Sequence, residues 1–285
     1  MKKNLIRITL LSVFALSFLL LTPSCNSNDD SIANQEQIQD ENIIINSGYL
    51  PLPIEQYNKI PSAKQISTTK SYPLSVNLSC PPILNQGGEG SCVSWGVGYA
   101  GRSISWQALY GGSYNYSVNI FSPEYIYNQI KVTDCASGSY VTDGLDLVVD
   151  QGVCVWNDMP YTDISCDVYP DNYQVLQAAN YKAASYNTVP KTVDAFKDQL
   201  AAGKPIVVGG PVYRQFYYLG YDQIQTKTVR NYGGHCYCVV GYDDSKGAFL
   251  VMNSWGTNWG TNGFGWVSYS IMTKVWSEAY VLNEL

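Results

Sequence analysis

A single histidine, His235, limits where acid–base chemistry at neutral pH can take place in this chain of 285 residues. Asn253 follows it in the segment Asn253-Ser254-Trp255-Gly256, and Cys92 lies far upstream. A cysteine, a histidine and an asparagine can act as a nucleophile, its base and the group that orients the base. The residue types therefore predict acyl transfer through a thioester, with His235 as the only candidate base.

Cys92 must lose its proton before it can attack a carbonyl carbon, because the thiolate is the nucleophile. Apolar side chains recur every three to four residues after Cys92, which predicts a helix that ends near Gly111-Gly112. The N-terminus of this helix and a protonated His235 would both lower the pKa of the Cys92 thiol. We therefore expect a thiolate–imidazolium pair, in which His235 later protonates the leaving amine.

Gln86 and Asn253 are candidates for two supporting roles. The Gln86 side chain can donate an N–H to a developing oxyanion, beside the backbone N–H of Cys92. Asn253 can accept a hydrogen bond from the second ring nitrogen of His235 and hold the ring in place. Each residue also has an ordinary interpretation, because a glutamine can lie on the surface and an asparagine can form a turn.

Four separated motifs resemble those of the papain family of cysteine peptidases, and they occur in the same order. They are Gln86 six residues before Cys92, His235 with Val239-Val240-Gly241-Tyr242, Asn253-Ser254-Trp255-Gly256 with Trp259-Gly260 and Asn262-Gly263-Phe264-Gly265, and Asp150-Gln151-Gly152-Val153-Cys154 leading to Met159-Pro160-Tyr161. The resemblance extends over about residues 72–269, which is essentially the whole globular part.

The resemblance implies a role for each matching residue. Cys92 would be the nucleophile, His235 the base and acid, Asn253 the residue that orients the ring, and Gln86 the oxyanion donor. Trp255 would shield the histidine–asparagine hydrogen bond from water. The implied fold is α+β with two packed lobes, a helical lobe that carries Cys92 and an antiparallel, barrel-like β lobe that carries His235 and Asn253.

The sequence departs from the family pattern near the nucleophile and in the substrate cleft. Glu89 stands where the family has a cysteine, so the usual first disulfide cannot form, and Val93 replaces an aromatic residue. The paired glycines that line the family's cleft are represented only by Gly138-Ser139. We expect Gly138, Ser139 and Tyr140 to border the substrate-binding site.

Helices dominate the first half of the globular part and strands the second. Ser122 before Pro123 predicts the start of a second helix, and residues 142–149 predict a third. Apolar runs between Gly or Asp turns predict strands at 205–209, 236–241, 248–253 and 265–269. This order of elements indicates an α+β protein in two packed halves. Together with the resemblance it implies a peptidase domain at 72–285, with lobes at about 72–180 and 181–285.

The first 24 residues resemble the signal peptide of a bacterial lipoprotein. Three cations precede a short apolar run, which is too short for a comfortable membrane span. Leu21-Thr22-Pro23-Ser24-Cys25 then resembles the cleavage box in which the cysteine is lipidated. We expect a lipid anchor on Cys25 and a location at the bacterial outer membrane or cell surface, the alternative being a secreted or periplasmic protein.

Residues 25–71 are polar and rich in Asn, Gln, Ser and Pro, with little periodicity. This composition is typical of a tether between a membrane and a domain. A short propeptide is the alternative interpretation. The segment lacks the length and the long helical pattern of typical papain-family propeptides, so it gives little reason to expect autoinhibition.

Composition and cysteine spacing narrow the choice of partners and cofactors. The net charge is −6 and no basic run is present, so nucleic acid is not an expected partner. Cys236 and Cys238 lie on the same side of an expected strand and are expected to be small, buried residues. A zinc site there is disfavoured because no C-x-x-C spacing occurs. We expect no metal or organic cofactor, protein or peptide substrates, and a monomer.

Three alternatives to a cysteine endopeptidase remain open. The chain could be a catalytically inactive binding protein on a peptidase scaffold, although such proteins usually lose the cysteine or the histidine. It could be a thioester acyl transferase, in which an amine and not water resolves the intermediate. It could also be an aminopeptidase, which requires a segment that blocks one end of the cleft. The pairing of the remaining cysteines is likewise open.

Overall fold

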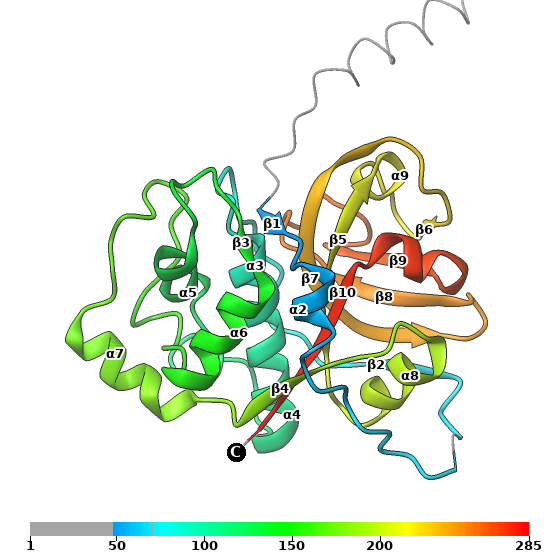
Figure 1. The fold of residues 1–285 in the computed structure, drawn as a ribbon, viewed down its shortest axis with the longest axis horizontal. Coiled ribbons are helices and arrows are strands. Elements are labelled where there is room, and N and C mark those ends of the chain that lie inside the picture. Colours follow the sequence, from blue (N-terminus) through cyan, green and yellow to red (C-terminus); the bar gives the residue numbers. More distant parts are fainter. Residues whose placement is uncertain (1–47, 70, 285) are drawn as a thin grey trace, which may run out of the picture. The chain divides into compact units, whose positions relative to one another are not determined.

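The computed structural model describes residues 48–69 and 71–284. They belong to one compact unit, in which a helical lobe lies beside a β lobe (Figure 1). The expected signal peptide, residues 1–24, and Cys25 lie outside the described residues. Within the described residues, no helix has both the length and the apolar composition needed to cross a membrane. The predicted α+β fold with two lobes is confirmed.

The helix predicted after Cys92 is confirmed. It consists of α3 (Cys92–Ser94), the π-helical segment η1 (Trp95–Arg102) and α4 (Ser103–Tyr110). It ends at Gly111, whose φ of 73° is accessible to glycine at little cost. A Cβ atom on Gly96 would lie 2.8 Å from the Cys236 sulfur. The glycines of η1 therefore allow the helix to pack directly on the β lobe.

The other helices of this lobe agree with the sequence where a prediction was made. The Ser122 hydroxyl accepts the Tyr125 N–H and caps α5 (Pro123–Ile130). The predicted third helix is α6 (Val141–Asp150). A further helix, α7 (Asn172–Ala178), begins at an Asp171 capping box and was not predicted, and the 3₁₀ turn η2 (Ala179–Tyr181) follows it.

The β lobe is built on an eight-stranded sheet. In spatial order its strands are β4 (Ser185–Thr188), β10 (Glu278–Asn283), β5 (Ile206–Tyr213), β7 (Asn231–Asp243), β8 (Ala248–Met252), β9 (Phe264–Ser268) and β6 (Ile224–Gln225), with β2 (Ser75–Asn77) also beside β7. The helical elements on the same lobe are α8 (Val193–Ala201), α9 (Arg214–Tyr217), η3 (Tyr269–Ile271) and α10 (Met272–Val275). All four predicted strands are present, in β5, β7, β8 and β9.

Two features of the sheet differ from the expected antiparallel, barrel-like lobe. β6 runs parallel to β9, so the sheet is mixed. Its end strands β4 and β6 do not pair with each other within the described residues, so the sheet is not a closed barrel. A two-residue strand such as β6 offers too few backbone groups to complete a barrel.

Strand β7 joins the two lobes, because its opposite faces belong to different cores. Cys236 and Cys238 are fully buried free thiols on the face toward η1, and the Cys238 sulfur lies 3.1 Å from the Gly96 carbonyl oxygen. Tyr237 and Val239 belong to the core of the β lobe. The prediction of small, buried cysteines at these positions is confirmed, and the alternation places His235 on the same face of β7 as Tyr237.

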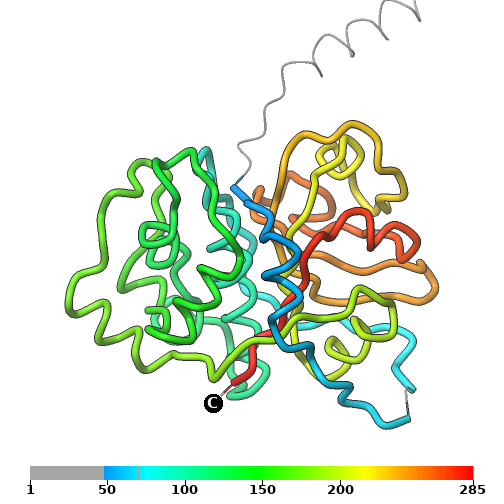
Figure 2. The backbone as a smooth tube through the Cα atoms, in the orientation of Figure 1, coloured from blue at the N-terminus to red at the C-terminus, as the bar shows by residue number. Residues whose placement is uncertain are grey.

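The segment before residue 70 packs on both lobes. It contains β1 (Tyr49–Leu50) and α2 (Ile54–Tyr57). Figure 2 shows it in blue, running along the boundary between the lobes and then along the β lobe. The Ala63 N–H donates to the Thr188 carbonyl over 2.7 Å, and the Ile66 N–H donates to the Asp198 carboxylate over 2.7 Å. These contacts hold residues 63–66 on the β lobe.

Candidate active site

The candidate catalytic side chains come from both lobes and meet at their boundary. Cys92 is the first residue of α3, His235 lies in β7, and Asn253 follows β8. Nε2 of His235 lies 2.7 Å from Oδ1 of Asn253. Trp255 stacks on the imidazole, with ring centroids 4.5 Å apart and an interplanar angle of 23°. Three of the predicted site residues are therefore in direct contact.

The hydrogen bonds of Asn253 determine which ring nitrogen of His235 carries the proton. Oδ1 of Asn253 also accepts the Ser254 backbone N–H over 2.8 Å, so this atom is an acceptor. Nε2 of His235 is then the donor, and Nδ1 keeps the lone pair. A neutral imidazole in this tautomer can take a proton through Nδ1.

Burial sets the protonation states of the thiol and the imidazole. It raises the pKa of Cys92 to about 12, although nearby backbone N–H groups, that of Cys236 foremost, lower it. It lowers the pKa of His235 to about 4, against the opposing effect of the Asn253 hydrogen bond. Burial therefore favours the neutral form of both groups. The expected thiolate–imidazolium pair stays a prediction, and the exclusion of water from both side chains opposes it.

A segment of the chain itself covers Cys92. We call residues Gly48 to Leu52 the strap. A Cβ atom on Gly48 would lie 2.9 Å from the Cys92 sulfur and 2.4 Å from the Gly90 carbonyl oxygen. No side chain fits at position 48, so the bare backbone of the strap lies directly against the thiol, and Cys92 has no exposed surface.

The strap pairs with the segment predicted to bind substrate. β1 runs parallel to β3 (Ser139–Tyr140), with Tyr49 opposite Ser139. The Ser139 N–H donates to the Gly48 carbonyl over 3.1 Å. Gly138 is bound within its own loop, where its carbonyl accepts the Val132 N–H. Residues 138–140 therefore already hold an extended peptide, as a substrate-binding edge would.

Gln86 is fixed by groups that the sequence did not single out. Its Oε1 accepts the Ser254 hydroxyl over 2.7 Å, and its Nε2 donates to the Glu89 carbonyl over 3.0 Å. The Tyr161 hydroxyl donates to the Gln86 carbonyl over 2.6 Å. Ser254 and Tyr161 both lie inside motifs that resemble those of the papain family. Their place in these motifs is the signal by which the sequence could have identified them. They orient the amide N–H₂ of Gln86 toward the loop that precedes Cys92.

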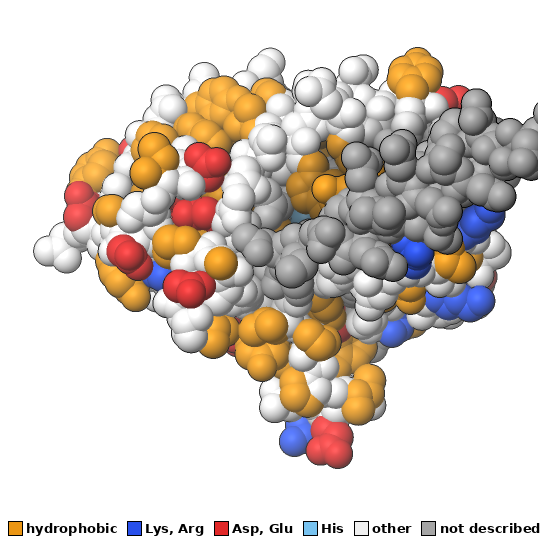
Figure 3. Space-filling view, turned by 90° about the horizontal axis from the view of Figure 1, so that it is seen from above, with side chains coloured by type: hydrophobic (Ala, Val, Ile, Leu, Met, Phe, Trp, Pro, Cys, Tyr) orange, Lys and Arg blue, Asp and Glu red, His pale blue; other side chains and the backbone are white. Residues whose placement is uncertain are grey.

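A groove beside Trp255 continues the site beyond the strap. It is lined by Asn85, Gly87, Tyr217, Tyr218, Leu219, Trp255, Asn258 and Trp259. On the face shown in Figure 3, hydrophobic side chains border a hollow between the lobes. The groove offers apolar and aromatic surface next to the imidazole of His235.

Comparison with known proteins identifies the family. The model described as papain family cysteine protease matches residues 73–281, a range that includes every catalytic candidate named above. The chain belongs to the papain family of cysteine peptidases. It is accordingly a hydrolase, and proteins or peptides are its class of substrate.

Individual relatives agree with this assignment. A cathepsin B-like protein of Giardia intestinalis is 27% identical over 246 residues, which make up 80% of this peptidase and 76% of that protein. The crystal structure of xylellain, a cysteine protease from Xylella fastidiosa, is 26% identical with a TM-score of 0.73, and the match covers 85% of this chain and 97% of that one. A procathepsin B from Trypanosoma congolense is 14% identical with a TM-score of 0.68, over 92% and 99% of the two chains, and shares the fold.

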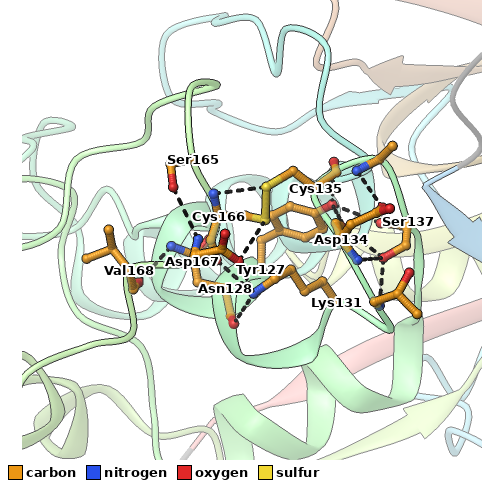
Figure 4. A network of polar contacts seen from close by, with 12 residues as sticks. Tyr127, Asn128, Lys131, Asp134, Cys135, Ser137, Ser165, Cys166, Asp167 and Val168 are labelled. Carbon is orange, nitrogen blue, oxygen red and sulfur yellow. Dashed lines mark hydrogen bonds and ion pairs between the residues drawn. A yellow bond between two sulfur atoms is a disulfide. The ribbon is translucent and has the colours of Figure 1, made fainter.

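A disulfide holds the loop that leads into β3 of the peptidase. Cys135 is bonded to Cys166, and the surrounding polar contacts are shown in Figure 4. The Tyr127 hydroxyl lies 2.8 Å from the carbonyl oxygens of both Cys135 and Ser137. The Gly90 N–H donates to the Cys135 carbonyl over 2.9 Å. The bridge therefore supports both the strap-binding edge and the residues that precede Cys92.

Glu89 lies beside this disulfide. Its Oε1 has no hydrogen-bond partner among the described residues, and burial and the nearby Glu124 raise its pKa to about 7. One carboxylate oxygen lies within 4.8 Å of the sulfur atoms of Cys135 and Cys166. These sulfurs are bonded to each other, so they are not thiolate ligands for a metal.

Replacing Cys135 and Cys166 together by serine should lower the stability of the peptidase. The bridge spans 31 residues, and closing such a loop is worth about 3–4 kcal/mol by the chain-entropy estimate. Thermal unfolding followed by circular dichroism measures the loss. The matched control is Cys80→Ser, which replaces a free, partly buried thiol. Cys236 and Cys238 are unsuitable as controls, because serine at these positions would bury a new hydroxyl group. An unchanged midpoint in the bridge variant would contradict the prediction.

Proposed function

We propose that this papain-family peptidase is an endopeptidase that cleaves peptide bonds through a thioester on Cys92. The observation that carries the proposal is the His235–Asn253 hydrogen bond at 2.7 Å, covered by the stacked ring of Trp255. This bond leaves Nδ1 of His235 unprotonated. The next residue in β7 is Cys236, and its backbone N–H lies beside the Cys92 sulfur. A base of this kind is what a cysteine nucleophile requires.

The reaction has two halves. Nδ1 of His235 takes the Cys92 proton, and the thiolate forms a bond to the carbonyl carbon of the substrate. The Cys92 backbone N–H and the amide of Gln86 donate to the oxyanion. Collapse breaks the C–N bond, and His235 returns its proton to the leaving amine. Water, deprotonated by His235, then breaks the thioester and restores the Cys92 thiol.

The full chain is a latent form of the peptidase in this proposal, and residues 25–71 include a short propeptide. The burial of Cys92 beneath Gly48 supports latency. So does the high pKa of the buried thiol, since a neutral thiol is a poor nucleophile. Activation requires that the strap leave β3, either by cleavage or by detachment.

A lipid anchor on Cys25 and a location at the outer membrane or cell surface complete the proposal. They rest on the cleavage box at residues 21–25. Intact mass spectrometry of the chain recovered from a bacterial membrane fraction tests them. A diacylglyceryl adduct that is lost in Cys25→Ala is expected, and an unmodified chain cut elsewhere would contradict the anchor.

Labelling with an epoxysuccinyl cysteine-peptidase probe tests the catalytic assignment. The full chain and its Tyr49→Ala form, which lacks the buried strap side chain bonded to Glu278, are compared by intact mass and peptide mapping. We expect a single adduct at Cys92 in the Tyr49→Ala chain, and no adduct when His235→Ala is added. No adduct and no cleavage of an unfolded protein in either chain would favour a binding protein. Transfer of the acyl group to an added amine would favour an acyl transferase.

Gln86→Ala should reduce kcat by about 10²- to 10³-fold with a small change in KM, because an oxyanion donor acts mainly in the transition state. Ser254→Ala should cause a smaller loss, since the amide of Gln86 keeps its bond to Glu89. Steady-state kinetics on a peptide substrate in the Tyr49→Ala background measures both. A Gln86→Ala enzyme with unchanged kcat would remove this residue from the mechanism.

A further inference from the structure

Glu89 is a buried acid in the loop between the two proposed oxyanion donors, Gln86 and the backbone N–H of Cys92. Its side chain lies in a residue that is only 3% exposed. The family has a cysteine at this position, so the resemblance implies no role for a carboxyl group here. The reaction steps given above assign no task to Glu89 either. What this acid does therefore has to follow from its own contacts.

The Tyr161 hydroxyl links Glu89 to both oxyanion donors. This hydroxyl lies 2.6 Å from the Gln86 carbonyl oxygen, 2.7 Å from the Ser91 hydroxyl and 3.2 Å from Oε2 of Glu89. Ser91 directly precedes Cys92, and Nε2 of Gln86 donates to the Glu89 carbonyl over 3.0 Å. One phenol group therefore holds the chain on both sides of the oxyanion site.

The number of hydrogen atoms in this cluster decides which protonation state satisfies it. The Gln86 carbonyl oxygen can only accept, so at 2.6 Å it takes the single hydrogen of the Tyr161 hydroxyl. The Ser91 hydroxyl must then donate to the Tyr161 oxygen. Oε2 of Glu89 can donate to the same oxygen only when the carboxyl group carries its proton. With a protonated Glu89, all three contacts are hydrogen bonds at once.

We infer that Glu89 is a positioning residue for the oxyanion site, and that its protonated form is the one that holds Gln86 in place through Tyr161. The inference rests on the proposed function and deepens it. When Glu89 loses its proton, the carboxylate and the Gln86 carbonyl compete for the one Tyr161 hydrogen. Hydrogen bonds to a charged acceptor are about twice as strong as those between neutral groups. The carboxylate therefore takes this hydrogen, and Gln86 loses a support.

The surroundings of Glu89 favour the protonated form. Burial and the like charge of Glu124 raise its pKa to about 7. Asp163 also raises this pKa, while the Tyr161 hydroxyl and Lys131 lower it. Oε1 of Glu89 has no hydrogen-bond partner among the described residues, and a neutral acid tolerates this better than a carboxylate. The charged and titratable groups that face Glu89 are Glu124, Tyr127 and Lys131 on α5 and at its end, and Tyr161 and Asp163 on the loop after Met159.

The inference fixes the direction of a pH effect on catalysis. Below a pH of about 7, Glu89 is protonated and Gln86 keeps its support. As the pH rises through this value, kcat should fall by about tenfold, which is the effect of one lost hydrogen bond. KM should change little, because the oxyanion forms only after the substrate has bound.

Steady-state kinetics on a peptide substrate tests the inference, in the full chain carrying Tyr49→Ala and over about pH 5 to 9. Glu89→Gln keeps the shape of the carboxyl group and supplies a permanent N–H donor toward Tyr161. Glu89→Ala removes the group, and Tyr161→Phe removes the hydroxyl through which it acts. Glu55→Gln, an exposed change of the same type in α2, is the matched control.

We expect Glu89→Gln to retain the low-pH kcat of the Tyr49→Ala parent and to lose the decrease near pH 7. Glu89→Ala and Tyr161→Phe should each lower kcat by about tenfold at low pH with little change in KM, and their combination should cost no more than either alone. Glu55→Gln should follow the parent profile. A decrease that persists unchanged in Glu89→Gln, which keeps the test valid if Glu89→Ala fails to fold, would overturn the inference.

The pH dependence of stability tests the protonation of Glu89 without any cleavage. An acid whose pKa is higher in the folded chain than in the unfolded chain, about 4.3, favours folding at low pH. This contribution is lost as the pH rises through the folded pKa of about 7. The unfolding midpoint of the full chain should therefore fall by roughly 5 °C relative to that of Glu89→Gln between about pH 5 and 8. A constant difference would mean that Glu89 is ionised throughout, which contradicts the inference.

The two measurements separate failure of the inference from failure of the proposed function. If the Tyr49→Ala chain cleaves no peptide bond, the endopeptidase assignment fails, and the unfolding midpoints still decide whether Glu89 is protonated. If the chain cleaves with a kcat that is independent of Glu89 and Tyr161, the inference fails and the peptidase assignment stands.

Discussion

Replacing Cys92 or His235 by alanine is expected to abolish peptide-bond hydrolysis, by roughly 10⁶-fold for residues that act as one catalytic unit. Cys92 supplies the atom that binds the acyl group, and His235 is the only histidine in the chain, so no second imidazole can replace it. Turnover of a fluorogenic peptide, measured in the Tyr49→Ala background, gives both losses. The double variant should be no worse than either single variant.

Cys154→Ala is the matched control for this loss. Cys154 is a free thiol, fully buried in the helical lobe, and it contacts none of the candidate catalytic side chains in the hydrogen bonds described above. Its replacement should leave turnover close to that of the parent chain. Retained hydrolysis in Cys92→Ala or in His235→Ala would contradict the mechanism directly.

Gly48→Ala is expected to release the strap and make Cys92 reactive. The new methyl group would fall 2.4 Å from the Gly90 carbonyl oxygen and 2.9 Å from the Cys92 sulfur, and backbone atoms cannot yield by that much. Alkylation of Cys92 by iodoacetamide in the full chain should accelerate by roughly 10- to 100-fold, the effect of 1–3 kcal/mol of overpacking. Peptide mapping assigns the modified residue.

The pH dependence of alkylation provides a second reading of the same change. Burial raises the pKa of Cys92 to about 12, so the reactive thiolate is scarce at neutral pH and increases as the pH rises. Lifting the strap removes part of that burial and lowers the pKa, which moves the rate profile toward lower pH. Gly144→Ala, where the added methyl meets only ordinary contacts of 3.4 Å or more, should change neither rate nor profile. An unchanged profile in Gly48→Ala would mean that the strap does not protect Cys92.

The catalytic candidates could be found from the sequence because their signals are local. Gln86, Cys92, His235 and Asn253 each lie in a short local motif, and the helix after Cys92 shows its apolar period directly. Their arrangement in space then follows from the fold that these runs indicate. The tautomer of His235 does not follow from the residue types alone, because an asparagine side chain can donate or accept, and the Ser254 N–H that Oδ1 of Asn253 accepts decides it.

The features that the sequence did not reveal depend on contacts between distant residues. The strap is a Gly-Tyr-Leu-Pro-Leu run with no periodic pattern, and its pairing with Ser139 joins segments about ninety residues apart. Glu278 reaches the site in β10, an element that was not predicted. Predicting the Cys135–Cys166 bridge requires the path of the two loops that carry these cysteines. Predicting the raised pKa of Cys92 requires knowing which residues bury the thiol.

The contact of Tyr49 with both Gly209 and Glu278 has a consequence for how this protein can diverge. These three residues fit one another closely, so a replacement at any one of them would loosen the segment that covers Cys92. Positions 49, 209 and 278 should therefore drift together among relatives. A relative that carries a different residue at 209 or 278 would carry a compensating replacement at position 49.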